Sequence, residues 1–192
     1  MNVYMERALN IKPPQAMTAS KMDAEYFESI YHLHYKSVYN YIGFRINNHF
    51  DAEELASAVF ENAIRKFHLY KHDHSPIEAW LIGIAKNVVA DYLRRKRRMS
   101  FIPLDGVFGF AADGRRPDDV LVFNEANKVL IQTMARLKPQ ERQVLSMKFA
   151  TGLKNTEIAK ILNLSDSKVG VTIHRSVKKL RKWLEEGNTY EQ

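Results

Sequence analysis

The stretch from Ser75 to Arg98 constrains the fold most, because hydrophobic residues recur along it at three- and four-residue spacing. This period is typical of an α-helix that buries one face. Ser75 and Glu78 predict a capping box at its start, and Pro76 suits the first helical position. The predicted buried stripe consists of Ile77, Leu81, Ile84, Ala85, Val88 and Tyr92.

The same helix ends in five consecutive cations, Arg94 to Arg98, which is more positive charge than a helix end needs. One interpretation is a solvated run of charge. The other is a surface for a polyanion, because a basic helix that also carries Asn87 and nearby aromatic rings can hold phosphates and stack bases.

Helical periodicity also covers residues 24–47 and 51–67 and resumes near residue 122, whereas no stretch alternates as a strand would. Between the helical parts, glycine, proline and aspartate interrupt the pattern, which favours an interdomain linker. The predicted fold class is therefore all-α, with two small helical domains joined by a flexible linker. The predicted boundaries are a tail at 1–22, a first domain at 23–98, the linker at 99–122, a second domain at 123–186 and a tail at 187–192.

Asn155 to Leu180 fits a helix-turn-helix, although a plain helical hairpin would share its period. Ile158 and Val169 are apolar where the two helices must touch, and Ala159 is small where they cross. Asn163 can adopt the left-handed conformation that the turn requires.

The second helix of this pair is rich in cations, which favours DNA as its partner. Side chains near its start could reach base edges, and Arg175 is best suited to read guanine. Lys178 and Lys179 come later and fit phosphate contacts. The predicted contact residues of this helix are Lys168, Val171, Thr172, His174, Arg175, Lys178 and Lys179.

Composition narrows the function classes. The chain has 192 residues, a formal net charge of +7 and no cysteine. The charge favours an anionic partner, and the lack of cysteine excludes a disulfide framework and thiolate zinc sites. We expect no membrane insertion, because no apolar run is long enough to span a bilayer, and the lack of cysteine fits a cytoplasmic location. His68, His72, Asp73 and His74 invite a metal site, but only His68 and His72 have helical spacing, so no metal and no cofactor is predicted.

Three strings in order carry a family resemblance: DAEELASAVFENAIRKF, then AWLIGIAKNVVADYLRRKRR, then LKPQERQVLSMKFATGLKNTEIAKILNLSDSKVGVTIHRSVKKLRKWL. In sequence and spacing the chain resembles the sigma-70 family of bacterial sigma factors, and most of all the extracytoplasmic-function group. The resemblance covers most of the chain outside the tail and linker.

The resemblance implies an alternative sigma factor that binds core RNA polymerase and directs it to promoter DNA. Region 2 would melt the minus-10 element, and region 4 would read the minus-35 element with its helix-turn-helix. An anti-sigma factor is a further partner that it implies. The implied contacts with the clamp helices of the largest polymerase subunit are Asp51, Glu53, Glu54, Ser57 and Glu61. The implied minus-10 contacts are Lys86, Asn87, Arg94, Arg95, Arg98, His72 and His74.

Two other function classes stay open at this point. An autonomous helix-turn-helix regulator would bind DNA alone, but it would leave the basic helix at 75–98 unexplained. A DNA-processing enzyme would need a nucleophile with a base beside it, and Ser29, Ser37 and Ser57 have no evident base. We therefore expect no catalytic residues and no enzymatic activity.

Overall fold

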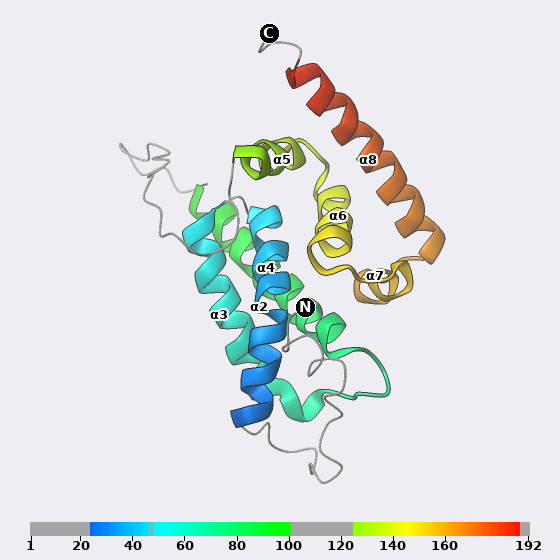
Figure 1. Cartoon of the computed structure of the whole chain (residues 1–192). Helices are drawn as coiled ribbons and strands as arrows, with labels where there is room; N and C mark the ends of the chain where they lie inside the picture. Colours follow the sequence, from blue (N-terminus) through cyan, green and yellow to red (C-terminus); the bar gives the residue numbers. More distant parts are fainter. Residues whose placement is uncertain (1–23, 47, 101–124, 189–192) are drawn as a thin grey trace, which may run out of the picture.

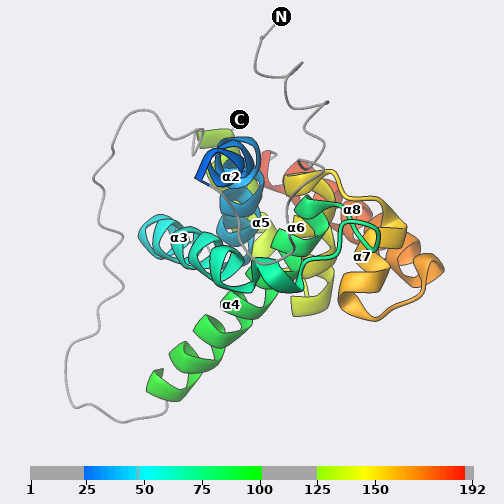
Figure 2. The ribbon, with the colours of Figure 1, turned by 90° about the horizontal axis from the view of Figure 1, so that it is seen from below.

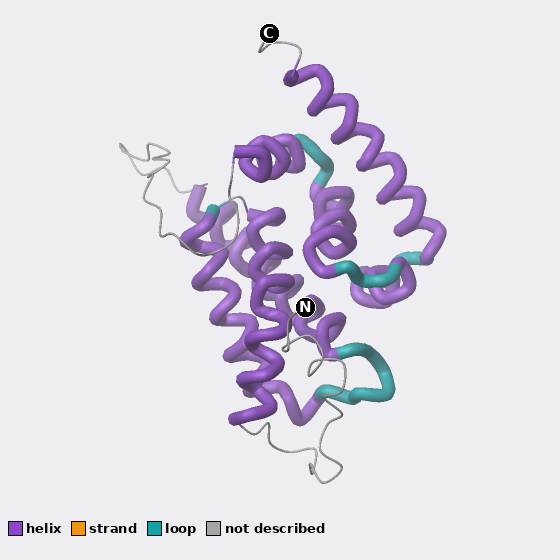
Figure 3. The backbone as a smooth tube through the Cα atoms, in the orientation of Figure 1, coloured by secondary structure: helices purple, strands orange, loops and turns teal. Residues whose placement is uncertain are grey.

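The computed structural model describes residues 24–46, 48–100 and 125–188, and within these ranges every regular element is a helix (Figure 3). The all-α prediction is confirmed. The predicted tail at 1–22 and most of the predicted linker lie outside the described residues. The elements are α2 (Ala24–Ile46), α3 (His49–Lys66), the 3-10 turn η1 (Phe67–Leu69), α4 (Ile77–Ser100), α5 (Glu125–Ala135), α6 (Pro139–Thr151), α7 (Asn155–Leu162) and α8 (Asp166–Asn188).

Helices α2, α3 and α4 pack against one another and bury the apolar stripes that the sequence predicts. Leu81 and Ala85 of α4 are fully buried, but so are Ile82 and Val89, which lie off the predicted stripe. Helix α4 is buried over a wider arc because it also contacts α7. Ile64 of α3 lies outside this core and is 48% exposed.

Two predicted helix starts differ from the observed ones. Helix α3 begins at His49, and the Asn48 side chain caps it by accepting from the Asp51 backbone amide at 3.3 Å. Helix α4 is assigned from Ile77, and Glu78 forms a hydrogen bond with Ser37 of α2. A long-range partner of this kind cannot be read from a local capping pattern.

Helices α7 and α8 form the predicted helix-turn-helix. Asn163 ends α7 in the left-handed conformation at φ 54°, and Gly152 ends α6 with φ 73°. Ile158, Ala159 and Val169 are buried, as their spacing predicts. Lys154 is the N-cap of α7, and its backbone amide donates to Glu157 Oε2 at 2.7 Å.

The two helical groups are packed together. Helix α2 lies along α6, and α4 contacts α7, as Figures 1 and 2 show from two directions. Val144 and Met147 of α6 belong to the same apolar core as Val38 and Ile42 of α2. One core therefore runs through both groups.

Candidate DNA and polymerase interfaces

The predicted base-reading residues project from α8, the second helix of the helix-turn-helix. His174 and Arg175 are exposed, and Val171 is 48% exposed. Behind them Val169 and Ser176 are fully buried, which fixes the rotation of α8 about its axis. The exposed face is therefore rigidly presented. Lys168 and Lys178 are also exposed, and the Thr172 hydroxyl donates to the Lys168 carbonyl of the same helix at 2.7 Å.

Lys179 differs from its neighbours because a carboxylate already holds it. Its Nζ lies 2.6 Å from Glu141 Oε1, and Glu141 also accepts from the Lys138 backbone amide at 3.2 Å. The hydrogen bond from Lys179 is the main cause that lowers the pKa of Glu141. A phosphate would have to compete with this ion pair for Lys179.

The basic end of α4 extends past the rest of the first helical group (Figure 2). Arg94, Arg95 and Arg98 are exposed there, with Arg94 paired to Asp91 on the same helix. Lys96 donates to the Tyr92 hydroxyl at 3.1 Å. The end of α4 is thus an exposed cationic surface.

Lys86 and Asn87 sit midway along α4 and have different surroundings. Asn87 is exposed. Lys86 is half-buried, and its Nζ donates to the Ile161 carbonyl of α7 at 3.1 Å. The first helix of the DNA-reading pair therefore lies directly against a predicted minus-10 contact.

His72 and His74 are exposed in the loop before α4. They lie at the opposite end of that helix from Arg98, roughly 30 Å away by helical rise. The predicted minus-10 residues therefore form no single cluster. They follow the length of α4, as contacts to an extended strand would.

An aromatic cluster supports this loop, and the sequence reasoning missed it. Tyr70 packs on Trp80 with ring centroids 5.1 Å apart, and Phe67 lies 5.9 Å from Tyr70. The Tyr70 hydroxyl donates to the Ser75 carbonyl at 3.0 Å, and burial raises the pKa of Tyr70 to about 12. The loop is therefore held from both sides, and the helical position of Trp80 at the edge of the buried stripe was its only signal in the sequence.

The predicted polymerase contacts of α3 also divide into two kinds. Glu54, Ser57 and Glu61 are exposed, and Glu61 lies 3.9 Å from Arg65. Asp51 and Glu53 are half-buried. The Tyr92 hydroxyl donates to Asp51 Oδ2 at 2.5 Å, so this carboxylate links α3 to the basic part of α4.

The histidines and aspartate considered for a metal site are dispersed. His72 Nδ1 lies 4.0 Å from Asp73 Oδ1, and both side chains are largely exposed. Over the described residues, no three histidine, aspartate or glutamate side chains gather as a metal ion would need.

None of the helices in the described ranges is long and apolar enough to cross a bilayer.

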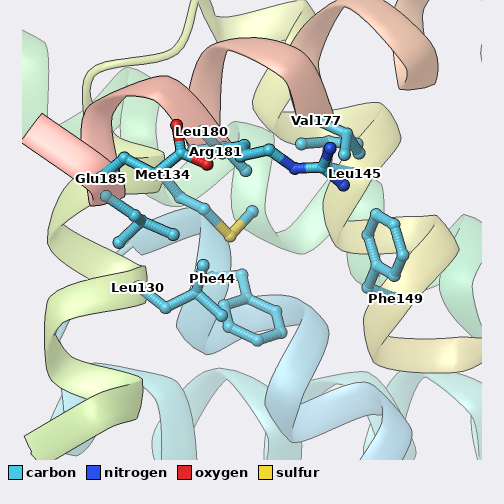
Figure 4. Close-up of a pocket in the computed structure, with 10 residues that line it drawn as sticks. Phe44, Leu130, Met134, Leu145, Phe149, Val177, Leu180, Arg181 and Glu185 are labelled. Carbon is cyan, nitrogen blue, oxygen red and sulfur yellow. The ribbon is translucent and has the colours of Figure 1, made fainter.

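An apolar pocket of about 470 Å³ opens between α2, α5, α6 and α8 (Figure 4). It contains none of the predicted DNA or polymerase contacts. Leu180 of α8 lines it together with Met134 and the 62% exposed Phe149. The full lining is Phe44, Leu130, Met134, Leu145, Phe149, Val177, Leu180, Arg181, Leu184 and Glu185.

Comparison with known proteins identifies both helical groups. Residues 30–99 match the family Sigma-70 region 2, and residues 128–180 match Sigma-70 region 4. The RNA polymerase sigma factor YlaC of Bacillus subtilis is 31% identical over 159 residues, covering 81% of this chain and 90% of that protein. The ECF RNA polymerase sigma factor BldN of Streptomyces coelicolor is 26% identical, and the match covers 84% of this chain but 61% of BldN.

The fold has a solved counterpart. The sigma factor RpoE of Bartonella quintana, in a co-crystal structure with the anti-sigma factor NepR, superposes with a TM-score of 0.69 at 18% identity. The match covers 83% of this chain and 96% of that one. Both sigma regions are thus present in one chain, in the order that the resemblance implied. The chain belongs to the sigma-70 family of RNA polymerase sigma factors, in the extracytoplasmic-function group.

Proposed function

We propose that this chain is an alternative sigma factor that binds core RNA polymerase and directs initiation at promoters with two separate recognition elements. The observation that carries the proposal is the pairing of two exposed cationic surfaces in one chain. One is the α8 face with His174 and Arg175, and the other is the arginine-rich end of α4.

The two surfaces suit different forms of DNA. A rigid helix whose exposed side chains include a guanidinium fits the major groove of a duplex, so α8 reads the minus-35 element. Cations spread along α4, with the exposed Asn87 between them, fit the backbone of a separated strand. The minus-10 element is therefore opened along α4, with the 70–76 loop holding an extruded base.

The polymerase contact in this proposal is the exposed acidic side of α3. Glu54, Ser57 and Glu61 are available to a partner, whereas Asp51 is engaged by Tyr92. Asp51 then acts mainly by fixing the start of α3. The domain boundaries at 23–98 and 123–186 are part of the same proposal.

Chains of this family are initiation factors and carry out no catalysis themselves, and we assign no enzymatic activity to this one. Its partners, polymerase and genomic DNA, imply a cytoplasmic location. By analogy with the Bartonella complex, an anti-sigma factor is proposed as a further partner. An autonomous regulator has no support, because it leaves the match of residues 30–99 to region 2 unexplained.

The proposal is tested by transcription of the protein's own genomic DNA with purified core RNA polymerase, with and without the chain. New start sites that share two spaced upstream motifs are expected. Specific binding of the chain alone to duplex DNA, without new start sites, would contradict the proposal and favour the regulator.

A further inference from the structure

Two arginines lie close together where α2 packs on α6. Arg45, near the end of α2, is only 8% exposed, and Arg142 of α6 is half-buried. Arg45 donates through Nη1 to the Pro139 carbonyl at 3.0 Å. Within the ranges that the structure describes, neither guanidinium forms an ion pair with a carboxylate. Two positive charges are thus buried side by side without a counter-charge from these residues.

Donors of this cluster also lack acceptors. The Nε atoms of both arginines and the hydroxyl of Tyr41 are buried without a hydrogen bond of good geometry among the described residues. Tyr41 is fully buried one turn before Arg45 on α2, and Gln143 of α6 lies beside its hydroxyl. A buried donor that loses water without gaining a partner is costly. Several such donors at one place indicate that an acceptor belongs between them.

The electrostatics of the cluster indicate that this acceptor is negatively charged. Burial lowers the pKa of Arg142, and the positive charge of Arg45 lowers it further. Burial raises the pKa of Tyr41, whereas the charge of Arg45 acts against that rise. Arginine does not lose its proton in proteins, so deprotonation cannot relieve the repulsion between the two guanidiniums. An anion between them would relieve it.

The nearest acid in the sequence is already engaged elsewhere. Glu141 precedes Arg142, but its Oε1 lies 2.6 Å from Lys179 Nζ, and its Oε2 accepts from the Lys138 backbone amide at 3.2 Å. The cluster is otherwise surrounded by the apolar core that α2 and α6 share. Charges attract more strongly in such a setting than in water. An anion from solution is therefore the partner that fits.

We propose that Arg45 and Arg142 bind a small inorganic oxyanion of the phosphate class between α2 and α6. A guanidinium presents parallel N–H donors that match two oxygens of an oxyanion, and a spherical chloride offers no such match. The Tyr41 hydroxyl supplies a further donor. Arg142 is only half-buried, so the anion can reach the site from its side. The site contains none of the residues proposed to contact DNA or polymerase, and the inference stands without those roles.

The Nε–H signals of the arginines in ¹H–¹⁵N NMR spectra of the full chain test the site directly. Sodium phosphate is added at constant pH and at constant ionic strength balanced with sodium chloride. Both Nε–H protons are expected to move downfield in a saturable way, because each gains a hydrogen bond. Arg45→Lys and Arg142→Lys identify the two signals by their loss. Signals that stay unmoved by phosphate would overturn the proposal.

Thermal unfolding measures the stabilisation in the same buffers. At a phosphate concentration about a hundredfold above the dissociation constant, the melting temperature should rise by about 5 °C and then level off. Arg142→Met removes one of the like charges at similar length, so without phosphate it should be at least as stable as the wild type. With phosphate, its apparent dissociation constant should be at least about tenfold weaker, since a charged hydrogen-bonding partner is lost.

Two other effects of phosphate are separated by this design. Phosphate stabilises many proteins because it is excluded from their surface, and this rise does not saturate and would be the same in Arg142→Met. Phosphate can also bind the exposed cations of α4, so Arg95→Met is the matched control and should respond like the wild type. A saturable rise that survives in Arg142→Met but is lost in Arg95→Met would place the anion on α4 and overturn the proposal.

Discussion

The two proposed DNA surfaces differ in how many of their side chains already form hydrogen bonds or ion pairs within the chain. On α8, His174, Arg175 and Lys178 are exposed, and Lys179 is held by Glu141. On α4, cations already have partners within the chain. Lys86 donates to the Ile161 carbonyl of α7, and Lys96 donates to the Tyr92 hydroxyl. The proposed duplex-reading face of α8 is thus largely exposed, whereas cations of the proposed strand contact on α4 already bind groups of the chain.

This difference follows from how each helix is packed. Helix α8 presents one face to solvent, so its period alone separates buried from exposed residues. Helix α4 contacts α2, α3 and α7. Contacts with elements distant in sequence therefore decide which of its polar side chains are free.

The largest expected effect concerns pH and the first helical group. Burial lowers the pKa of His34 on α2 to about 4, below the 6.5 of an unperturbed histidine. The unfolded chain therefore takes up a proton that the folded chain rejects, and the stability present above pH 6.5 is lost as pH falls toward 4. Between pH 7 and pH 5, the protonation of this histidine alone should lower the free energy of unfolding by about 2 kcal/mol.

Urea unfolding of the wild type and of His34→Gln at several pH values would measure this cost. The variant should lose that much less stability over the same range. The control is His32→Gln, which changes a histidine of the same helix whose side chain is 72% exposed, and it should follow the wild type. If the free energy of unfolding changed with pH in the same way for the wild type and His34→Gln, the lowered pKa of His34 would be contradicted.

The next effect concerns the exposed face of α8. Arg175→Ala should reduce discrimination at the minus-35 element roughly ten- to a hundredfold, because a bidentate arginine contact to guanine contributes about 1–3 kcal/mol. The loss of discrimination is measured by comparing how tightly the polymerase holoenzyme binds matched and mismatched promoter duplexes. Lys182→Ala, which removes a cation of the same helix 3.7 Å from Glu186, is the control. Equal loss of promoter discrimination and of core binding in Arg175→Ala would place this arginine outside the DNA contact.

Much of the local structure of the two surfaces could be predicted from the sequence. What could not be predicted has a physical cause. The turn at Asn163, the buried Val169 and the exposed Arg175 follow from local period and turn chemistry. The burial of Tyr41 and Arg45 does not, because helix α6, which covers them, lies about a hundred residues later in the chain. Candidate site residues could therefore be predicted by type and spacing, but the contacts that engage them within the chain required the tertiary structure.

A smaller effect concerns the link between α3 and α4. Tyr92→Phe keeps the ring but removes the hydroxyl that donates to Asp51 and accepts from Lys96, so the free energy of unfolding should fall by about 1–2 kcal/mol. A double-mutant cycle with Asp51→Asn measures the coupling between the two side chains. Additive losses would mean that this hydrogen bond contributes nothing to the position of α3.

The smallest effect concerns Lys179, the cation of α8 that pairs with Glu141. Glu141→Gln should lower the free energy of unfolding by about 1 kcal/mol near neutral pH, because it removes a partly exposed ion pair. Because Lys179 lowers the pKa of Glu141, the stability of this pair is present above about pH 4.5 and is lost as pH falls through the folded pKa. The difference between variant and wild type should therefore vanish in acid.

The same ion pair predicts how neighbouring lysines differ on DNA. Lys178→Ala should reduce the salt dependence of promoter binding by about one counterion, and Lys179→Ala by less, because Glu141 already neutralises Lys179. In a Glu141→Gln background the two substitutions should have equal effects. Equal slopes in the wild-type background would mean that DNA displaces Glu141 at no cost, and the two cations of α8 would then be equally available.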